Sequence, residues 1–340
     1  MSGLPRILVT GGAGYKGAIL VPKLLEKGYP VRVLDLYLYG EGADLFGRYQ
    51  NHPKLEQIKG DIRNTELVRS ALQGCEAVIH LACISNDPSC DLDPELTKSV
   101  NYGAFVPLVK MAKEEGVRRF IFASSSSVYG VSEKPNVDED HPRIPITAYN
   151  KYKAMCEDVL LQEQGGSFTT VIIRPATVCG YSPRQRLDLT VNILTNHAVN
   201  KGVITVFGGN QMRPNIHIED ITDLYVRLLE LPQSQIAGKV FNAGYENHTV
   251  SQLAHTVREV IREKLPSRGD IRIETTPSDD IRSYHITSER ITKEIGFTPR
   301  RTITDAVRDL ITAFQEGKLP NSMTDIRYYN IKLMQSVKLK

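Results

Sequence analysis

Short apolar runs alternate with amphipathic segments along the first half of the chain. The runs have the length of strands and lie at residues 6–10, 30–36, 55–62, 76–82, 118–125 and 169–176. Between them, apolar positions recur with helical spacing, as at residues 18–28, 65–74 and 101–116, and a further helix begins near Tyr149. Strands separated by helices of about ten to fifteen residues predict a parallel, doubly wound sheet. Because the strands are almost continuously apolar, both faces of this sheet should be covered.

The regular alternation ends after Gly180. A polar turn and a helical pattern at residues 190–202 follow, and residues 240–244 have the character of one more sheet strand. The pattern predicts an α/β fold with a smaller C-terminal α/β lobe. We expect residues 1–180, with a returning segment at about 215–245, to form the main domain. Residues 181–214 and 246–325 should form the lobe, and residues 326–340 a basic tail.

Composition and charge are those of an ordinary soluble globular protein. The 340 residues are 41% hydrophobic and 24% charged, and the formal net charge is +3. The sequence has no basic stripe with interleaved aromatic residues, so a nucleic-acid partner has no support. No apolar run approaches the ~18 residues of a membrane span, and the N-terminus lacks a signal-peptide pattern. We therefore expect no membrane partner and a cytoplasmic location.

The cysteines indicate neither disulfides nor a metal site. The chain has five of them, an odd number, and they form no CxxC pair. Reduced thiols in a cytosolic protein are the expectation, and no bound metal is predicted.

Three glycines follow the first predicted strand. Gly11, Gly14 and Gly17 are three residues apart and open the first helix. In a βαβ unit the first glycine permits a tight turn, the second lets the backbone approach a pyrophosphate, and the third allows close helix–strand packing. The anion then binds unpaired N–H groups at the N-terminus of the helix. The spacing predicts a dinucleotide site in a Rossmann-type domain.

Asp35 and Lys16 refine the predicted ligand. Asp35 ends the second predicted strand, where a carboxylate accepts hydrogen bonds from both ribose hydroxyls and repels a 2′-phosphate. This position favours NAD over NADP. Lys16 lies inside the glycine turn. Three interpretations of it are open: a phosphate contact, a solvated helix residue, or a sign that the turn binds a different ligand. Because a cation beside a diphosphate has the favourable sign, NAD remains the predicted cofactor.

Tyr149 and Lys153 are spaced i, i+4 on a predicted helix, which puts both on one face. A free tyrosine has a pKa of about 10 and is a poor base at neutral pH. A lysine cation and an oxidised nicotinamide nearby both stabilise the phenolate. Tyr149 is then able to remove a proton from a sugar hydroxyl as hydride leaves to NAD, and to return it in the reverse direction. Taken alone, the pair is also typical of a solvated helix face.

Together these motifs resemble one family over nearly the whole chain. The glycine turn, Asp35, residues 60–62, 80–82 and 124–130 and the Tyr149–Lys153 pair occur in the order seen in extended short-chain dehydrogenase/reductases. The resemblance extends from Gly11 to about Tyr284. Within the family, the sequence is similar to the nucleotide-sugar epimerase/dehydratase branch. It implies an NAD-dependent enzyme with a nucleotide-sugar substrate bound by the C-terminal lobe.

The resemblance also implies roles for single residues. It places the family's catalytic serine at Ser125, four residues before the tyrosine of the Val-Tyr-Gly signature, where its hydroxyl shares the substrate's hydroxyl with Tyr149. The implied catalytic residues are therefore Ser125, Tyr149 and Lys153. Asp61 and Ile62 are expected to meet the adenine.

The remaining cofactor contacts follow from the same match. Leu81 and Ala82 are expected to flank the cofactor ribose, and Arg174, Pro175 and Val178 to line the nicotinamide end. The implied cofactor-binding residues are Gly11, Gly14, Tyr15, Lys16, Gly17, Asp35, Asp61, Ile62, Leu81, Ala82, Tyr149, Lys153, Arg174, Pro175 and Val178.

Ser126 and Ser127 bear on the reaction. They occupy the positions at which nucleotide-sugar 4,6-dehydratases usually carry an adjacent Asp-Glu pair. Those side chains supply the acid and base that eliminate water after oxidation at C4, and serine has no suitable pKa near neutrality. The resemblance therefore favours a 4-epimerase over a dehydratase. A 4-dehydrogenase or 4-ketoreductase with external nicotinamide turnover stays open.

A short segment suggests one of these alternatives. Residues 182–192 resemble a subgroup that includes 4-dehydrogenases of nucleotide-activated heptoses. Arg184 and Arg186 in this segment are candidates for contacts with sugar hydroxyls or phosphates. Arginines on an exposed turn are equally often just solvated.

Two further arginines match motifs of the family. Residues 213–220 resemble its Arg-Asp-x-x-His-Val-x-Asp motif, with Pro214 in place of the Asp, and residues 279–287 resemble its second arginine segment. Arg213 and Arg282 suit a diphosphate, because planar guanidinium groups bind phosphate oxygens bidentately. We interpret His217 as a structural hydrogen-bonding residue. The expected substrate-binding residues are Ser126, Ser127, Arg184, Arg186, Asn192, Arg213 and Arg282.

Two broader expectations complete the sequence-based hypothesis. Many relatives pair two long helices per subunit, so residues 101–116 and the Tyr149 helix suggest a homodimer by analogy. A non-catalytic NAD-binding protein on the same fold is the alternative from another class. The presence of Ser125, Tyr149 and Lys153 together favours an enzyme.

Overall fold

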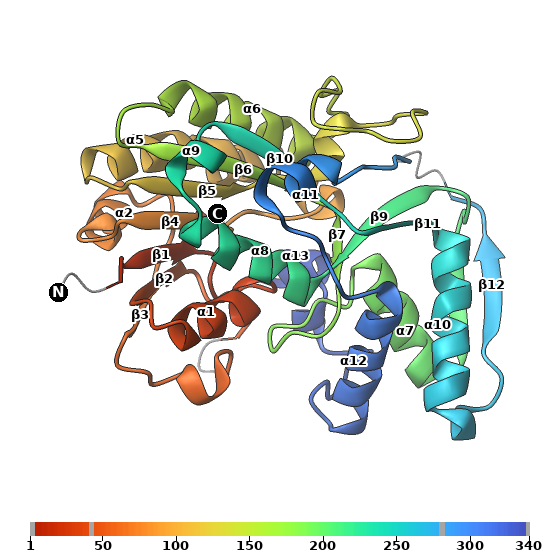
Figure 1. The fold of residues 1–340 in the computed structure, drawn as a ribbon. Helices are drawn as coiled ribbons and strands as arrows, with labels where there is room; N and C mark the ends of the chain where they lie inside the picture. The colour runs from red at the N-terminus through yellow and green to blue at the C-terminus, as the bar shows by residue number, and fades with distance from the viewer. Residues whose placement is uncertain (1–3, 41–43, 279–282, 338–340) are drawn as a thin grey trace.

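Seven parallel strands form the main sheet of the computed structural model, which describes residues 4–40, 44–278 and 283–337. Their order is β10-β6-β5-β4-β1-β2-β3 (Figure 1), which confirms the predicted Rossmann-type sheet. Because β1 lies between β2 and β4, the strand order reverses there and leaves a crevice at the carboxyl ends. The strands are β1 (Ile7–Thr10), β2 (Val31–Asp35), β3 (Leu55–Lys59), β4 (Ala77–His80), β5 (Arg119–Ala123), β6 (Thr169–Pro175) and β10 (Lys239–Ala243).

Helices cover both faces of this sheet, as the apolar strands predicted. Alternate residues of β5 belong to two different cores, because successive side chains of a strand point to opposite faces. Phe120 and Phe122 pack with α2, α5 and α6, whereas Ile121 and Ala123 pack with α1 and α8. The helices are α1 (Gly17–Glu26), α2 (Thr65–Leu72), α5 (Phe105–Glu114), α6 (Ala148–Glu163) and α8 (Ile218–Glu230).

A smaller lobe with its own core lies beside the sheet (Figure 1). Its helices α7, α10 and α12 pack on one another, and α7 and α10 also pack on β8 of the two-stranded sheet β8-β12. A three-stranded sheet, β7-β9-β11, runs between the lobe and the main sheet. The elements are β7 (Thr177–Cys179), α7 (Thr190–Lys201), β8 (Val203–Phe207), β9 (Met212–His217), β11 (Glu246–Thr249), α10 (Val250–Lys264), β12 (Arg272–Thr276) and α12 (Ile303–Gln315).

Two segments differ from the predicted elements. The helix expected at 101–116 begins with a π-helical turn, Ser99–Gly103, and α5 starts only after it. The segment expected to be a tail contains α13 (Asn330–Val337), which packs against α3 (Asp87–Cys90) on the body of the protein. The remaining helices are α4 (Pro94–Lys98), α9 (Gln233–Ile236) and α11 (Glu289–Ile295).

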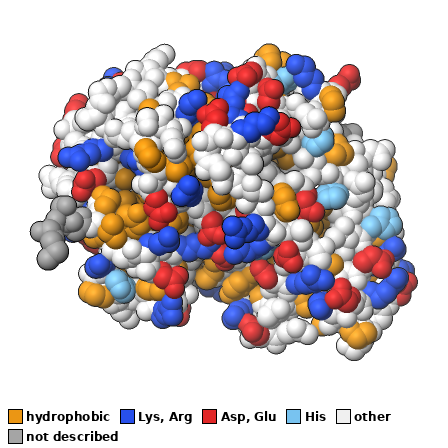
Figure 2. Space-filling model, viewed as in Figure 1, with side chains coloured by type: hydrophobic (Ala, Val, Ile, Leu, Met, Phe, Trp, Pro, Cys, Tyr) orange, Lys and Arg blue, Asp and Glu red, His pale blue; other side chains and the backbone are white. Residues whose placement is uncertain are grey.

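The surface carries charges of both signs. On the face drawn in Figure 2, basic and acidic side chains are interspersed. This mixture agrees with the near-balanced net charge of +3. Exposed ion pairs of this kind, such as Arg69 with Glu114 at 2.7 Å, contribute little stability individually.

The two-core arrangement predicts unequal effects for two phenylalanines. Phe120 is 0% exposed, whereas Phe207 on β8 is 59% exposed. Phe120→Ala should lower the free energy of unfolding by about 3–5 kcal/mol, because it removes buried apolar surface and leaves a cavity. The control, Phe207→Ala, should change it by less than about 0.5 kcal/mol. Urea unfolding followed by circular dichroism measures both, and equal effects would contradict the assignment of Phe120 to the core.

Candidate active site

A cavity of about 460 Å³ opens where the carboxyl ends of the central strands meet. Its wall takes residues from the turn after β1, from the ends of β2, β4 and β5, and from the segment that follows β6. It lies where the strand order reverses, which is the place where doubly wound sheets bind ligands. Its volume is in the range of small-molecule and cofactor sites.

The glycine turn in this wall requires residues without a side chain at two positions. Gly11 has a φ of +72°, and a Cβ there would lie 2.6 Å from the backbone nitrogen of Ala82. A Cβ on Gly17 would lie 2.3 Å from the carbonyl oxygen of Gly12. Among the described residues no side chain caps the N-terminus of α1, and its first turn has no acidic residue. The N–H groups of this turn are therefore suited to bind an anion.

Asp35 lies in the cavity wall at the end of β2. Its carboxylate accepts hydrogen bonds from the backbone N–H groups of Ala13 at 3.0 Å and Tyr37 at 2.8 Å. Burial raises the pKa of Asp35, and these two N–H groups act in the opposite direction. The carboxylate is thus held in place and retains acceptor capacity for ligand hydroxyls.

Asp61 and Ile62 line the cavity after β3, and Leu81 and Ala82 line it after β4. Arg63 donates to both carboxylate oxygens of Asp61, with Nη2 at 2.6 Å from Oδ2. Burial acts to raise the pKa of Asp61, but hydrogen bonds from the side chain and backbone of Arg63 hold it below its ordinary value. The negative charge of Asp61 in the cavity wall is therefore neutralised by Arg63.

Tyr149, Lys153 and Ser125 come together in the wall of the same cavity. Thr147 caps the N-terminus of α6, which puts Tyr149 in the first turn of that helix. One turn later, Lys153 donates from Nζ to the carbonyl oxygen of Ala123 at 2.7 Å, and its Nζ lies 5.9 Å from the centre of the Tyr149 ring. The start of α6 and the end of β5 thus bring the three predicted catalytic side chains together.

The surroundings of Tyr149 favour its neutral form. Burial raises the pKa of Tyr149 well above its ordinary value, Cys83 acts in the same direction, and Arg186 acts against them. The neighbouring Lys153 alone therefore does not make Tyr149 a base at neutral pH. Positive charge near the Tyr149 hydroxyl acts against the effect of burial, as that of Arg186 does.

Lys16 also lines the cavity, and the positive charge of Lys153 acts on its ammonium. Its Nζ is 5.9 Å from the centre of the Tyr225 ring on α8. Burial is the main cause that lowers the pKa of Lys16 to about 8, and the positive charge of Lys153 contributes. Burial, followed by the charges of Lys153 and Lys16, also lowers the pKa of His80 to about 3. Lys16 and Lys153 thus line the same cavity, and their positive charges oppose each other.

Ser126 and Ser127 lie in the wall next to Ser125. The Oγ atoms of Ser125 and Ser127 are 2.8 Å apart, and the hydroxyl of Ser126 donates to that of Tyr284 at 3.4 Å. The end of β5 thus presents hydroxyl groups to the cavity.

Arg213 lies on β9 and lines the cavity. Pro214, which replaces the Asp of the family motif, continues the regular strand and is paired in register with Asn247 of β11. The proline therefore leaves Arg213 in the cavity wall.

Arg184 and Arg186 line the cavity from the loop after β7, and both are buried. The interpretation as solvated arginines on an exposed turn is therefore wrong. Arg186 forms a bidentate ion pair with Asp188, with Nε to Oδ1 at 2.9 Å and Nη2 to Oδ2 at 3.1 Å. Arg184 instead donates from Nη2 to Oδ1 of Asn330, on α13, at 2.6 Å.

The structure corrects the prediction that Arg174 lines the nicotinamide end. Pro175 and Val178 lie in the cavity wall, but the Arg174 side chain does not. Its Nη2 donates to Glu157 at 2.7 Å, and its Nη1 donates to the hydroxyl of Tyr129 at 2.7 Å. Burial opposes the charge, but the hydrogen bond to Glu157 outweighs it and raises the pKa of Arg174. Arg174 is thus half of a buried ion pair in the core.

Asn192 is also corrected, since it supports the cavity wall from behind instead of lining it. Its Oδ1 accepts from the backbone N–H of Gly180 at 3.1 Å, and its Nδ2 donates to the carbonyl oxygen of Arg186 at 2.8 Å and to the Tyr15 hydroxyl at 3.1 Å. Gly14 and Tyr15 do line the cavity. Arg282 lies outside the described residues.

Several cavity residues were missed in the sequence. Tyr39, Asn86, Asn330 and Met334 line the cavity. No role was assigned to Tyr39 or Asn86 from the sequence, and Asn330 and Met334 lie in the segment that was expected to be a tail. Asn86 is a non-glycine residue with a φ of +76°, a conformation that often occurs at functional sites. The Asn-Asp-Pro sequence was a turn signal there, whereas no local pattern indicated that the C-terminal segment reaches the cavity.

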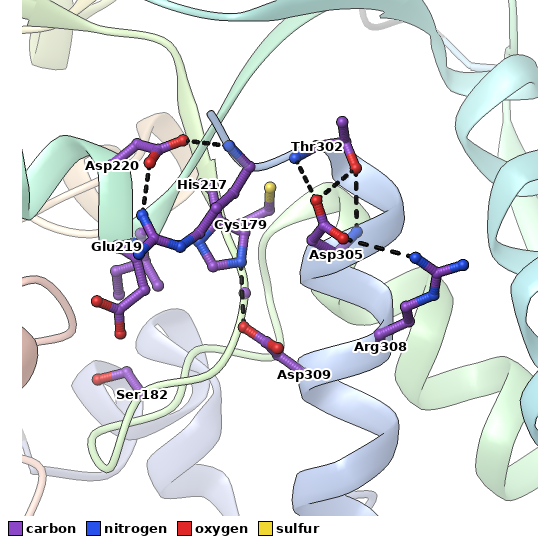
Figure 3. Close-up of polar contacts among 12 residues, drawn as sticks. Cys179, Ser182, His217, Glu219, Asp220, Thr302, Asp305, Arg308 and Asp309 are labelled. Carbon is purple, nitrogen blue, oxygen red and sulfur yellow. Dashed lines mark hydrogen bonds and ion pairs between the residues drawn. The ribbon is translucent and has the colours of Figure 1, made fainter. Parts of the chain in front are cut away.

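His217 connects the main domain to the lobe (Figure 3). It is not among the residues that line the cavity. Its Nδ1 accepts from the backbone N–H of Glu219 and so caps α8, and its Nε2 lies 3.2 Å from a carboxylate oxygen of Asp309 on α12. Nearby, Asp220 accepts from the backbone N–H of Arg301 at 2.7 Å and pairs with its guanidinium at 2.6 Å. These contacts agree with a structural role for His217.

The described residues form neither a metal centre nor a membrane-spanning helix. In the ranges that the structure covers, no cluster of His, Cys, Asp and Glu side chains is arranged to hold a metal ion. Nor does any helix there have the length and apolar character needed to span a bilayer.

Comparison with known proteins points to one family. The model of the NAD dependent epimerase/dehydratase family matches residues 7–244. The UDP-glucose 4-epimerase of Azospirillum brasilense is 26% identical over 326 residues, which cover 89% of this chain and 90% of that protein. The UDP-glucuronic acid decarboxylase 1 of Arabidopsis thaliana is 28% identical over 320 residues, which cover 91% and 70%.

A solved structure extends this similarity. UDP-glucuronic acid 4-epimerase from Bacillus cereus, in complex with UDP-glucuronic acid and NAD, has 25% sequence identity and a TM-score of 0.80. The superposition covers 92% of this chain and 99% of that one. The relatives thus share the fold while their reactions differ.

The buried position of Lys16 predicts a pH-dependent cost to stability. At pH 7, Lys16→Met should raise the free energy of unfolding of the cofactor-free protein by roughly 1–3 kcal/mol, because it removes a charge whose pKa burial has lowered. As the pH rises through about 8, the folded wild type loses this proton while the unfolded chain keeps it up to about 10.5. The advantage of the variant should therefore shrink across that window.

Urea unfolding of both proteins at pH 7, 8 and 9 measures this difference. Lys98→Met, at an exposed lysine on α4, is the control and should show a small effect that does not change with pH. A constant difference between Lys16→Met and the wild type would contradict the lowered pKa.

Proposed function

This chain belongs to the NAD dependent epimerase/dehydratase family, and we propose that it acts at C4 of a nucleotide-activated sugar as a 4-epimerase. The observation that carries the proposal is the meeting of Tyr149, Lys153 and Ser125 in one cavity with the glycine turn and Asp35. The three side chains supply proton transfer, and the turn and carboxylate supply a dinucleotide site.

The cavity fits NAD in its shape and charge. Gly11 and Gly17 leave room that a Cβ would fill, and the first turn of α1 offers N–H groups to a diphosphate. Asp35 is already fixed by two backbone N–H groups and accepts hydrogen bonds from the ribose hydroxyls. Asp61 and Ile62 contact the adenine. When bound, NAD supplies the acceptor and donor of the hydride exchanged at C4.

The chain's own residues move the proton and hold the sugar. Tyr149 accepts the proton of the C4 hydroxyl and returns it after the sugar has turned its other face. The hydroxyl of Ser125 donates to the same oxygen, and the ammonium of Lys153 stabilises the phenolate electrostatically. Because burial raises the pKa of Tyr149, its proton should leave only when the cavity is filled.

The carboxylates of the cavity support epimerisation over elimination. Ser126 and Ser127 stand where dehydratases carry an acid and a base. Asp61 is paired with Arg63, and Asp188 with Arg186. Asp87 accepts a hydrogen bond from Thr147. These carboxylates are already engaged, so the described wall offers no obvious acid–base pair for loss of water.

A nucleotide-sugar 4-dehydrogenase, with a heptose as one candidate substrate, is the second hypothesis. Lys16 favours it, because its ammonium adds positive charge beside Lys153 at the catalytic end. Positive potential disfavours the cationic, oxidised nicotinamide relative to the neutral, reduced one. A 4-ketoreductase uses the same residues. Substrate contacts by Arg213, and pairing of α5 and α6 in a homodimer, stay predictions.

The first experiment identifies the cofactor and the reaction. The purified protein is denatured and the released nucleotide identified, after which UDP-, GDP-, dTDP- and CDP-sugars are added to native protein while nicotinamide absorbance and products are followed. Released NAD and an isomeric product without net reduction would support the epimerase. Accumulated NADH with a keto sugar would replace it by the dehydrogenase, and no turnover of any sugar would contradict both.

Removing one hydroxyl tests the proton-transfer role. Tyr149→Phe should lower kcat by roughly 10²–10⁴-fold, because it deletes the general base, while NAD affinity measured by calorimetry stays nearly unchanged. The matched control is Tyr152→Phe on the same helix, whose ring stacks on Tyr102 at 6.3 Å outside the cavity wall. A Tyr149→Phe variant with full activity would exclude this mechanism.

A further inference from the structure

Arg184 is a buried cation without a carboxylate ion-pair partner in the part of the chain that the structure describes. It is 5% exposed and lines the cavity. Nη2 donates to Oδ1 of Asn330 at 2.6 Å and Nη1 to the carbonyl oxygen of Gln185 at 3.5 Å, whereas Nε is buried without a hydrogen-bond partner. The guanidinium carbon lies 3.4 Å from the centre of the Tyr39 ring. These neighbours thus hold the guanidinium of Arg184 in one position but do not neutralise its charge.

Arg186, two residues away, has the carboxylate partner that Arg184 lacks among the described residues. Burial opposes its charge too, but the carboxylate of Asp188 compensates and raises the pKa of Arg186. The pKa of Arg184 is lowered to about 10, chiefly by burial. An uncompensated buried charge is strongly unfavourable, and a planar guanidinium with a free N–H matches phosphate oxygens. A bound anion of this kind would complete the site.

The neighbours of Arg184 belong to the dinucleotide half of the cavity. Tyr39 lies in the segment that follows β2, and Asp35 at the end of β2 is close enough for its charge to act on Arg184. Arg213, the expected contact for the diphosphate of the sugar nucleotide, lies on a different element, β9. We propose that Arg184 binds the diphosphate of NAD as a second anchor besides the glycine turn, an inference that rests on NAD as the cofactor of the proposed function.

Helix α13 holds this anchor in position. Asn330 accepts from Arg184, donates from its backbone N–H to Asp188 at 3.1 Å, and donates from Nδ2 to Ser85 at 3.0 Å. Met334, one turn later, packs in the small apolar cluster next to α3 and α4. Asn330 is therefore a positioning residue, and α13 helps to bind the dinucleotide by holding Arg184 in place.

Calorimetry on cofactor-free, full-length protein tests the proposal. Arg184→Met should weaken binding of both NAD and ADP-ribose by roughly 10- to 100-fold, because it removes charge-assisted hydrogen bonds to a phosphate. Asn330→Ala should raise the dissociation constant of NAD by a smaller factor than Arg184→Met, because it leaves the charge of Arg184 in place. The control, Arg268→Met, removes a partly buried arginine that donates to the carbonyl oxygen of Val199 outside the cavity, and should not alter NAD binding.

A second arm distinguishes the two diphosphates. UDP, GDP, dTDP and CDP are titrated into NAD-loaded protein, and Arg184→Met should change their affinity little. Weakened binding of these nucleotides with unchanged NAD affinity would overturn the proposal and assign Arg184 to the sugar nucleotide. Unchanged binding of every ligand would overturn it as well.

Two features keep the test independent of folding and of the substrate. If Arg184→Met does not fold, Arg184→Lys keeps the charge without the planar fork and should weaken NAD binding by a smaller factor. An NAD affinity equal to that of the wild type in the lysine variant would then overturn the proposal. Because the readout is NAD affinity, failure of the proposed sugar chemistry would not affect it.

Discussion

The geometry of the site depends on one buried carboxylate, that of Glu157. It is fully buried, and it accepts hydrogen bonds from the hydroxyl of Ser124 at 2.5 Å, from Arg174 at 2.7 Å and from Arg143 at 3.2 Å. Glu157 follows Lys153 by one helical turn and Tyr149 by two, so anchor and catalytic side chains share a face of α6. The ion pair with Arg174 therefore fixes α6 against β6, and the hydrogen bond from Ser124 fixes it against the end of β5, next to Ser125. Because loss of either partner would leave an unpaired buried charge, small displacements of this helix are costly.

The cavity itself has the opposite electrostatic character. Lys16, Lys153 and Arg184 face it without carboxylate ion-pair partners among the described residues, whereas Asp61 and Asp188 in its wall are already neutralised by arginines. The other two carboxylates of the wall, Asp35 and Asp87, accept hydrogen bonds from two backbone N–H groups and from the Thr147 hydroxyl. The folded protein thus carries an uncompensated positive charge where two diphosphate-containing ligands are expected. Anions that bind there relieve a cost that the empty protein bears, so ligand binding and folding stability should be strongly linked.

Much of this was accessible from the sequence, because it depends on local pattern. The period of apolar residues identified the strands of the main sheet, and Gly11, Asp35 and the Tyr149–Lys153 spacing placed side chains at strand ends or on a helix face. The errors have a different origin. The sequence places Arg174 on the correct strand. Whether its side chain points to the cavity or to the core depends on Glu157, which is close to it only in three dimensions. Asn192 likewise supports Gly180 from a helix of the lobe. The contact of Asn330 with Arg184 spans 146 residues, and no local period encodes it.

Helix α13 has a consequence for how the protein is made. Met334 contributes to the cavity wall, yet it follows the glycine turn by more than three hundred residues and Arg184 by one hundred and fifty. During synthesis the sheet, the glycine turn and Asp35 are present long before this helix leaves the ribosome. The nascent chain therefore passes through a stage in which the cavity lacks the part of its wall that Asn330 and Met334 supply. The hydrogen bond from Arg184 to Asn330 forms only after that stage.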